Sequence, residues 1–202
     1  MQQRFDDMQT RRQTNGQRES NLWKGLAAGL VGGMVASVVM NQFQALLSKL
    51  AGEEERSHGA QSMQQGSPQH GAGRMLQERG SDEEQDDAAG RLANTIAVGV
   101  FDHELTKSEK ETAGTALHYA YGVSMGAFYG VAAEITPVVT IGAGVPYGAV
   151  IWVTADEGVV PALGLSKPAS EYPLSIHAYA LASHLVYGLT VEIVRGAVRR
   201  AL

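Results

Sequence analysis

Four stretches of the chain contain no Asp, Glu, Lys or Arg, and each is 20 to 24 residues long. They are residues 25–48, 112–133, 135–155 and 172–191. A helix needs roughly 20 apolar residues to cross the hydrocarbon core of a bilayer. Glycine-rich helices without charge on any side would be poor helix formers in water. The pattern therefore predicts four membrane-spanning helices rather than a buried four-helix soluble bundle.

Polar residues gather between these runs and divide the chain into five parts. Residues 1–21 are rich in Gln, Arg, Asp and Asn, which predicts a flexible, disordered N-terminal tail. Residues 22–48 form the first predicted span, and residues 49–87 form a long, low-complexity acidic loop outside the membrane. Residues 88–111 are predicted to form an amphipathic helix and a linker. Residues 112–202 complete an all-α integral membrane four-helix bundle with three more helices and a basic tail.

The third run carries its own start and stop signals. Thr136-Pro137 is a natural helix start, because proline is tolerated in the first turn. Pro146 lies in the middle of the run and is expected to kink the helix there. Asp156-Glu157 is expected to end it, before a loop rich in proline and glycine.

The neighbouring helices also have predicted starts. Thr106 or Ser108 is the expected N-cap of the second membrane helix, since either side-chain oxygen can accept from a free backbone N–H. Pro173 marks the start of the fourth helix.

The basic residues predict the orientation of the four spans. Five bases precede or include Lys24, three lie near the C-terminus, and Lys167 is the one base in the loop between the third and fourth runs. By the positive-inside rule both termini are expected to be cytoplasmic. Trp23-Lys24 fits an anchor at the headgroup level. A cleaved signal peptide is the alternative interpretation of the first run, although no small-x-small cleavage site follows it.

Glycines recur at a spacing of four in two of the predicted spans. Such spacing lets two helix backbones approach closely in a membrane. Because four residues turn a helix by about 400°, each line drifts round its helix and suits a right-handed crossing. We expect these residues to pack helices together, within the chain or against a partner protein. They are Gly25, Gly29 and Gly33 in the first span and Gly114, Gly122, Gly126 and Gly130 in the second.

Composition excludes several classes of function. The chain has no cysteine, so it has no disulfides, thiolate zinc sites, cysteine nucleophiles or cysteine-ligated iron–sulfur clusters. Its net charge of −5 leaves no basic surface for nucleic acid. No nucleophile elbow, phosphate loop or HExxH motif is present. We therefore predict no catalytic residue, and a protein that is not an enzyme.

Ionisable side chains inside membrane spans are costly, and they are functional candidates for that reason. Three groups follow from the predicted topology: an outer group, His184 near mid-membrane, and a group near the inner face beside Arg195. The outer group comprises His118, His177, Asp156, Glu157 and Glu171. The inner group contains Glu134 and Glu192.

Three interpretations of this polar network stay open. In the leading one it responds to protons or ions, because histidine titrates near neutrality. In another, the polar groups only fix helix register, and the protein is a structural or accessory subunit of a larger membrane complex. In the third, His118 with His177 or His184 ligates haem or a metal. We predict no cofactor and no metal site. The expected partners are the lipid bilayer and a homo-oligomer or larger complex.

Three sequence blocks carry a family resemblance. They are HYAYGVSMGAFYGVAAEITP at residues 118–137, WVTADEGVVP followed by ALGL from residue 152, and HLVYGLTVEIVRGAVRR at residues 184–200. Together they resemble the YagU-like family of bacterial inner-membrane proteins, over residues 92–200. The resemblance implies a multi-pass protein of the bacterial inner membrane, and it supplies no established activity. The long Gln- and acid-rich insertion departs from compact members of that family.

Overall fold

The computed structural model describes residues 2–50 and 88–202, with the side chains of residues 21–47, 49 and 88–202. Within these ranges every regular element is helical, so the prediction of an all-α protein is confirmed. The longer helices are α1 (Gln2–Leu50), α4 (Ala88–Phe101), α5 (Lys107–Ile135), α6 (Val145–Thr154) and α8 (Leu174–Ala201). The shorter elements are the 3₁₀ turns Pro137–Thr140 and Ala169–Glu171, the π-helical turn Ala155–Val159 and α7 (Val160–Ala162).

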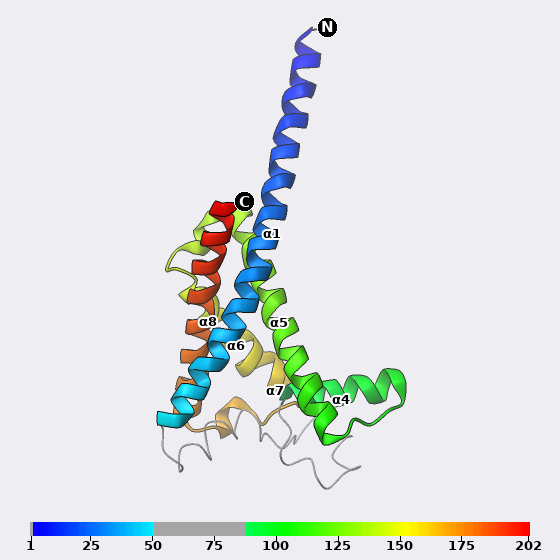
Figure 1. Cartoon of the computed structure of the whole chain (residues 1–202), viewed down its shortest axis with the longest axis vertical. Helices are drawn as coiled ribbons and strands as arrows, with labels where there is room; N and C mark the ends of the chain where they lie inside the picture. Colours follow the sequence, from blue (N-terminus) through cyan, green and yellow to red (C-terminus); the bar gives the residue numbers. More distant parts are fainter. Residues whose placement is uncertain (1, 51–87) are drawn as a thin grey trace.

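Helices α1, α5, α6 and α8 lie side by side as a bundle, and α4 lies across one end of it (Figure 1). Helix α1 packs against both α5 and α8, and α6 packs against α8. At the opposite end from α4, the Lys24 ammonium group donates to the carbonyl oxygen of Leu202 at 2.8 Å. Residue 24 and the end of α8 therefore lie on the same side of the bundle, as expected for four alternating helices.

Two of the four bundle helices are long and apolar enough to cross a membrane. They are Asn21–Leu47 within α1 and Leu174–Ala201, which is α8. A core helix of a soluble protein or a signal sequence meets the same measure of length and composition. Helix α6 has only ten residues before its π turn, and α5 opens with a charged stretch, 107–111. The four-span membrane bundle therefore stays a prediction.

The predicted course of the third helix is wrong at its start. The chain leaves α5 at Ile135, makes a 3₁₀ turn, and begins α6 only at Val145. Gly142 and Gly144, with Ala143 between them, all have positive φ angles, which build a left-handed turn that ends any earlier helix. Pro146 thus falls in the first turn of α6, where a missing N–H costs nothing, and it causes no kink.

The predicted end of this helix is also wrong. Asp156 and Glu157 lie in a π-helical turn, and the helix continues through it to Ala162. The predicted starts of the neighbouring helices are confirmed: Thr106 caps α5, and Pro173 precedes α8. The helix predicted within residues 88–111 is confirmed as α4.

Residues 2–20 continue α1 as a helix, although their composition predicts a flexible tail. Gln, Arg and Met are good helix formers, and they extend a helix that is already nucleated further along. This part of α1 projects beyond the bundle in Figure 1. Most of the predicted acidic loop, residues 51–87, lies outside the described residues.

The two predicted lines of glycine pack against one another. A Cβ atom added at Gly29 or Gly33 would collide with the backbone of α5, at Gly126 and Gly122 respectively. A Cβ atom at Gly25 would meet the carbonyl oxygen of Gly130 at 2.6 Å. The two backbones are thus in direct contact, as small residues at a spacing of four allow. Gly114, the remaining predicted packing residue, is buried in α5.

A second glycine contact joins α6 to α8. An added Cβ at Gly144 or Gly148 would collide with the carbonyl oxygen of Gly188 or His184, respectively. Sequence reasoning missed this contact because only two glycines of α6 keep the spacing of four, and one of them lies at the N-cap.

Glycine substitution tests the α1–α5 contact. In Gly126→Ala the new methyl group would lie 2.5 Å from both the carbonyl oxygen of Gly29 and the Cα of Gly33, so backbone must move. We expect a loss of about 1–3 kcal/mol in unfolding free energy, measured by reversible denaturation in mixed micelles. Gly196→Ala is the matched control, because an added Cβ there meets nothing within 4 Å. Equal stability of the two variants would refute the contact.

The first turn of α5 provides a pH-dependent test. The Thr106 hydroxyl and backbone N–H hydrogen-bond the Glu109 carboxylate at 2.7 and 2.8 Å, and these bonds hold the pKa of Glu109 below its ordinary value. A lowered pKa means that this stabilisation is present above the ordinary pKa and is lost as pH falls through the lowered one. We expect amide exchange in the first turn of α5, compared with the intrinsic exchange rate at each pH, to accelerate over that acidic range.

Substitution of the cap isolates its contribution. Thr106→Ala should give the accelerated exchange at neutral pH, since an N-cap contributes about 1 kcal/mol. Ser108→Ala, which removes the other hydroxyl that the sequence offers as a cap, is the control and should leave the exchange unchanged.

Candidate functional site

The π-helical turn Ala155–Val159 gives α6 a surplus residue and directs two consecutive carboxylates toward α8. Its closing bond runs from the Val160 N–H to the carbonyl oxygen of Ala155, five residues earlier. Turns of this kind inside α-helices are frequent at functional sites. Asp156 reaches His184, and Glu157 reaches His177, seven residues apart on α8.

The contact between Glu157 and His177 is the closer of the two. Glu157 Oε1 lies 2.6 Å from His177 Nδ1, and His177 Nε2 lies 3.1 Å from the carbonyl oxygen of Ala169. A carbonyl oxygen only accepts, so Nε2 must carry a hydrogen. The short Nδ1–Oε1 contact then needs one more proton between the two atoms, on the imidazole or on the carboxyl group. The pair therefore holds one exchangeable proton between two groups that can each carry it.

The second pair is looser and deeper. His184 is buried, and its Nδ1 lies 2.9 Å from the carbonyl oxygen of Ala180, to which it must donate. Asp156 Oδ2 lies 3.6 Å from the same nitrogen, within range of an ion pair but beyond hydrogen-bond distance. Among the described residues this buried oxygen has no hydrogen-bond donor. The Asp156–His184 contact is thus an electrostatic one without a shared proton.

Aromatic rings enclose the first pair. Trp152 and Tyr172 both meet the His177 ring edge to face, with centroids 6.4 and 6.5 Å away. Trp152 stands one turn before the π segment on the same helix. An indole ring at this distance is a natural optical reporter of the state of His177.

Tyrosine hydroxyls fill the middle of the bundle. Tyr147 donates to the carbonyl oxygen of Met125 at 2.7 Å, and Tyr187 donates to that of Gly122. Tyr129 stacks at a tilt on Tyr147, with ring centroids 4.6 Å apart. Each of the two donated hydrogen bonds ties α6 or α8 to a backbone carbonyl of α5. This layer separates the histidine pairs from the charges at the other end of the bundle.

Two arginine–glutamate pairs lie at that other end. Arg199 binds Glu134 of α5 through two nitrogens, at 2.6 and 3.3 Å, and also donates to Asn21 of α1 at 3.1 Å. Arg195 binds Glu192 on its own helix through two nitrogens, at 2.7 and 2.8 Å. The Arg199 side chain therefore links three helices, whereas the Arg195 pair is local to α8.

Six of the eight predicted network residues each take part in one of these four ion pairs, two pairs at each end of the bundle. Asp156, Glu157 and His177, which were assigned to the outer group, lie close together, and His184, which was assigned to a separate position, pairs with Asp156. Glu171 is exposed in a 3₁₀ turn, and its carboxylate enters neither pair. His118 lies on α5, with its ring against Tyr119 at 5.7 Å between centroids. Neither residue therefore belongs to the two pairs on the π turn.

Sequence reasoning missed several residues of this region. Arg199 was expected to lie in a basic tail, yet it binds Glu134 across 65 positions of sequence. Tyr129, Tyr147 and Tyr187 were not selected, although tyrosines within otherwise uncharged runs are a detectable signal. Trp152 lies in one of the family-like blocks.

The described residues offer little for a metal or haem. They contain no group of three or more His, Asp or Glu side chains placed to hold a metal ion. Both ring nitrogens of His177 are engaged, with a carboxylate and a carbonyl oxygen. A ligating imidazole needs a nitrogen with a free lone pair, so this arrangement does not offer His177 as a ligand.

Residues 74–193 match the sequence profile of a family described as "Protein of unknown function (DUF1440)". The chain belongs to the DUF1440 family. The matched region contains both histidine–carboxylate pairs, whereas α1 lies outside it. No curated protein and no solved structure matches the chain. The resemblance seen in the sequence is thus confirmed as membership of DUF1440, and the finer YagU-like assignment stays a prediction.

A double-mutant cycle measures the link that Arg199 makes in this DUF1440 protein. For Glu134→Gln with Arg199→Gln we expect a coupling energy of about 1.5–3 kcal/mol, the range for hydrogen bonds to charged groups. The matched cycle is Glu192→Gln with Arg195→Gln. Its coupling should stay below about 0.5 kcal/mol, because that pair lies within one helix and persists when the helices separate. Equal couplings would contradict the assignment of Arg199 as the tertiary link.

Proposed function

We propose that this DUF1440 protein is a multi-pass protein of the bacterial inner membrane whose histidine–carboxylate pairs respond to protons. In this proposal it crosses the membrane four times, with both termini on the cytoplasmic side, and it is not an enzyme. The single observation that carries the function is the 2.6 Å contact between Glu157 Oε1 and His177 Nδ1.

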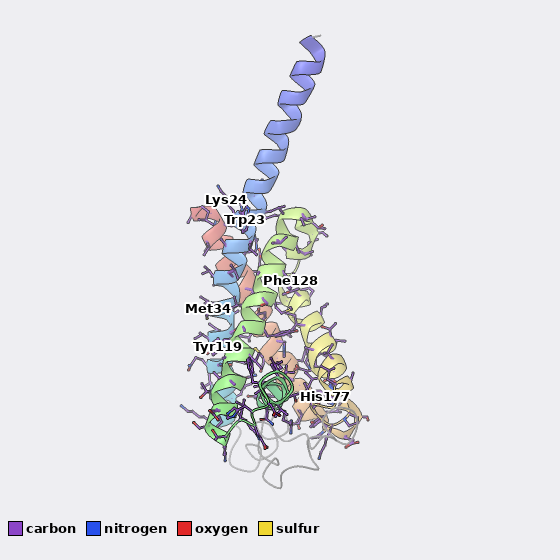
Figure 2. The ribbon with its side chains drawn as sticks, turned by 90° about the vertical axis from the view of Figure 1, so that its right-hand side faces the viewer. Trp23, Lys24, Met34, Tyr119, Phe128 and His177 are labelled. Carbon is purple, nitrogen blue, oxygen red and sulfur yellow. The ribbon has the colours of Figure 1, made fainter. Side chains whose placement is uncertain are left out.

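The distribution of side chains on α1 supports the membrane placement. The face toward α5 and α8 carries the glycines together with Ala28, Ala36 and Ser37, which are buried. The opposite face exposes large apolar side chains, among them Met34 (Figure 2). Water-soluble proteins bury such side chains, whereas lipid-facing helices expose them and pack through small residues. The exposed set is Leu30, Val31, Met34, Val35, Val38, Val39 and Leu46.

The geometry of the pairs supports a proton as the species that is sensed. Histidine changes its charge between about pH 5 and pH 8, and a neighbouring carboxylate can exchange that proton with it. Loss of the shared proton would leave one ring hydrogen for two acceptors, Glu157 Oε1 at 2.6 Å and the carbonyl oxygen of Ala169 at 3.1 Å, so one of the two contacts must open. Opening of the Glu157 contact is the proposed response. Both carboxylates lie on one π turn, so this opening would move α6 against α8.

The middle of the bundle favours a responsive element over a conducting path. A proton relay needs groups that pass hydrogen bonds from one to the next. The hydroxyls of Tyr147 and Tyr187 instead donate to backbone carbonyls, which cannot carry the proton further. We therefore propose a change of conformation as the output, with no proton flux across the bundle.

The glycine contacts weaken the case for an accessory subunit. Exposed glycine ridges would favour docking to a larger complex, but both predicted lines are covered within the chain by the α1–α5 contact. In this proposal the partner of the exposed apolar face of α1 is therefore the lipid bilayer.

Fluorescence of Trp152 tests the proposed response. In a Trp23→Phe background, reconstituted in liposomes, Trp152 should be the sole tryptophan and lies 6.4 Å from the His177 ring. We expect its emission to change between about pH 5 and pH 8, because protonation alters the charge of the neighbouring imidazole. His177→Gln should abolish this change, and Glu157→Gln should move its midpoint.

Two controls make the test specific. His103→Gln removes an exposed histidine outside the bundle and should leave the titration unchanged. His118→Ala should also leave it unchanged, since His118 belongs to neither pair. A titration that survives in His177→Gln would rule the proposal out. A pH gradient that decays faster in liposomes containing the protein than in empty ones would replace the responsive element with a conducting path.

A further inference from the structure

Helix α4 buries its long polar side chains and exposes large apolar ones, which is the reverse of an ordinary surface helix. Its one charged residue, Arg91, is 7% exposed, and Asn94 is 4% exposed. Both side chains are therefore buried on the inner side of the helix, where Asn94 Oδ1 accepts from the Leu105 N–H at 2.9 Å. The side chains on the outer side are apolar: Ile96, Val100 and Phe101 are 44%, 69% and 72% exposed. A surface helix in water would present the opposite arrangement.

The length of α4 excludes one explanation of this apolar face. The helix has 14 residues, about 21 Å at 1.5 Å per residue, which is too short to cross a bilayer. Apolar stretches of this length are buried core helices or segments that lie in the membrane interface. The exposure of Val100 and Phe101 excludes a buried core helix.

The orientation of α4 matches an interfacial helix. It runs sideways from the bundle in Figure 1 and is seen nearly end-on in Figure 2, so it lies across the bundle axis. Figure 2 shows it at the level of His177, with the exposed ring of Phe128 further along the same face of the bundle. The apolar surface of α4 thus lies on the same side of the bundle as an exposed apolar side chain of α5.

The depth of α4 agrees with the thickness of a bilayer. The Tyr179 hydroxyl donates to the carbonyl oxygen of Gln44, which sets the start of α8 level with Gln44 on α1. From Trp23 to Gln44 the helix rises about 32 Å at 1.5 Å per residue. The hydrocarbon core of a bilayer is about 30 Å thick. Trp23-Lys24 and α4 therefore stand about one hydrocarbon thickness apart, at the two boundaries.

We propose that α4 lies in the outer lipid interface, with Ile96, Val100 and Phe101 inserted among the lipid chains. This inference rests on the proposed membrane placement of the bundle. The occupant of the apolar face is lipid. The helix differs from common interfacial helices in that its polar side is bound by the protein instead of facing water. It thereby fixes the end of the bundle nearest to His177 at the membrane surface.

Site-directed spin labelling tests this proposal, because the chain has no cysteine and any introduced one is labelled alone. Val100→Cys, Met34→Cys and Glu104→Cys are reconstituted in lipid nanodiscs. For each, collision with oxygen, which enters lipid, is compared with collision with a water-soluble nickel complex. Met34 represents the lipid-facing side of α1, and Glu104 is exposed in the loop after α4. We expect the oxygen-to-nickel ratio at Val100→Cys to be several-fold higher than at Glu104→Cys.

The outcomes separate the inference from the proposal on which it rests. Equal ratios at Val100→Cys and Glu104→Cys, with a high ratio at Met34→Cys, overturn the inference and leave the membrane placement intact. A low ratio at Met34→Cys overturns the membrane placement itself. Spin–spin broadening between copies labelled at Val100→Cys would show that a second copy covers this face, which also overturns the lipid assignment.

A second measurement protects the test against a variant that fails to fold. Phe101→Trp, in a background of Trp23→Phe and Trp152→Phe, places the one tryptophan on the outer side of α4. We expect lipids brominated near the headgroup to quench its emission more strongly than lipids brominated near the chain ends. Quenching by a water-soluble quencher alone would overturn the proposal.

Discussion

Direct backbone contact between helices is the constraint on which the rest of this structure depends. At Gly29 and Gly126 the backbones of α1 and α5 touch, and at Gly144 and Gly188 those of α6 and α8 do so. At these points of contact there is no room for a large side chain between the two helices. On α1 most large apolar side chains therefore point outward, and the short distance between the helices makes polar contacts across them possible. Both the exposed apolar surface and the histidine–carboxylate contacts follow from this one condition.

Local signals in the sequence were sufficient for much of the fold. The Thr106 cap, the start of α8 after Pro173 and the glycine lines depend on residues within one or two helical turns, and all are present in the structure. The start of α6 was wrong because the left-handed turn through Ala143 depends on close packing against Gly188 of another helix. Tertiary contact overrode a local preference there.

For the candidate site, the sequence predicts the residue types but not how they pair. The network residues were selected because ionisable side chains are costly inside apolar spans. Six of the eight selected residues lie in ion pairs. Their pairing could not be predicted, since it depends on the π turn, and one surplus residue in a helix leaves no signature in sequence periodicity. Arg199 was missed because its partner, Glu134, is distant in sequence.

The π turn has a consequence for how steep a response to acidity can be. Asp156 and Glu157 are consecutive residues of one turn, so relaxation of that turn to ordinary α-helix would rotate both away from α8 at once. The contacts with His177 and His184 would then break together rather than one after the other. If both contacts respond to protons as proposed, their titrations are coupled through this turn, and the apparent pKa values belong to the pair. In the proposed response, uptake of one proton would favour uptake of the other, and the turn would change state over a narrower range of pH than an isolated histidine does.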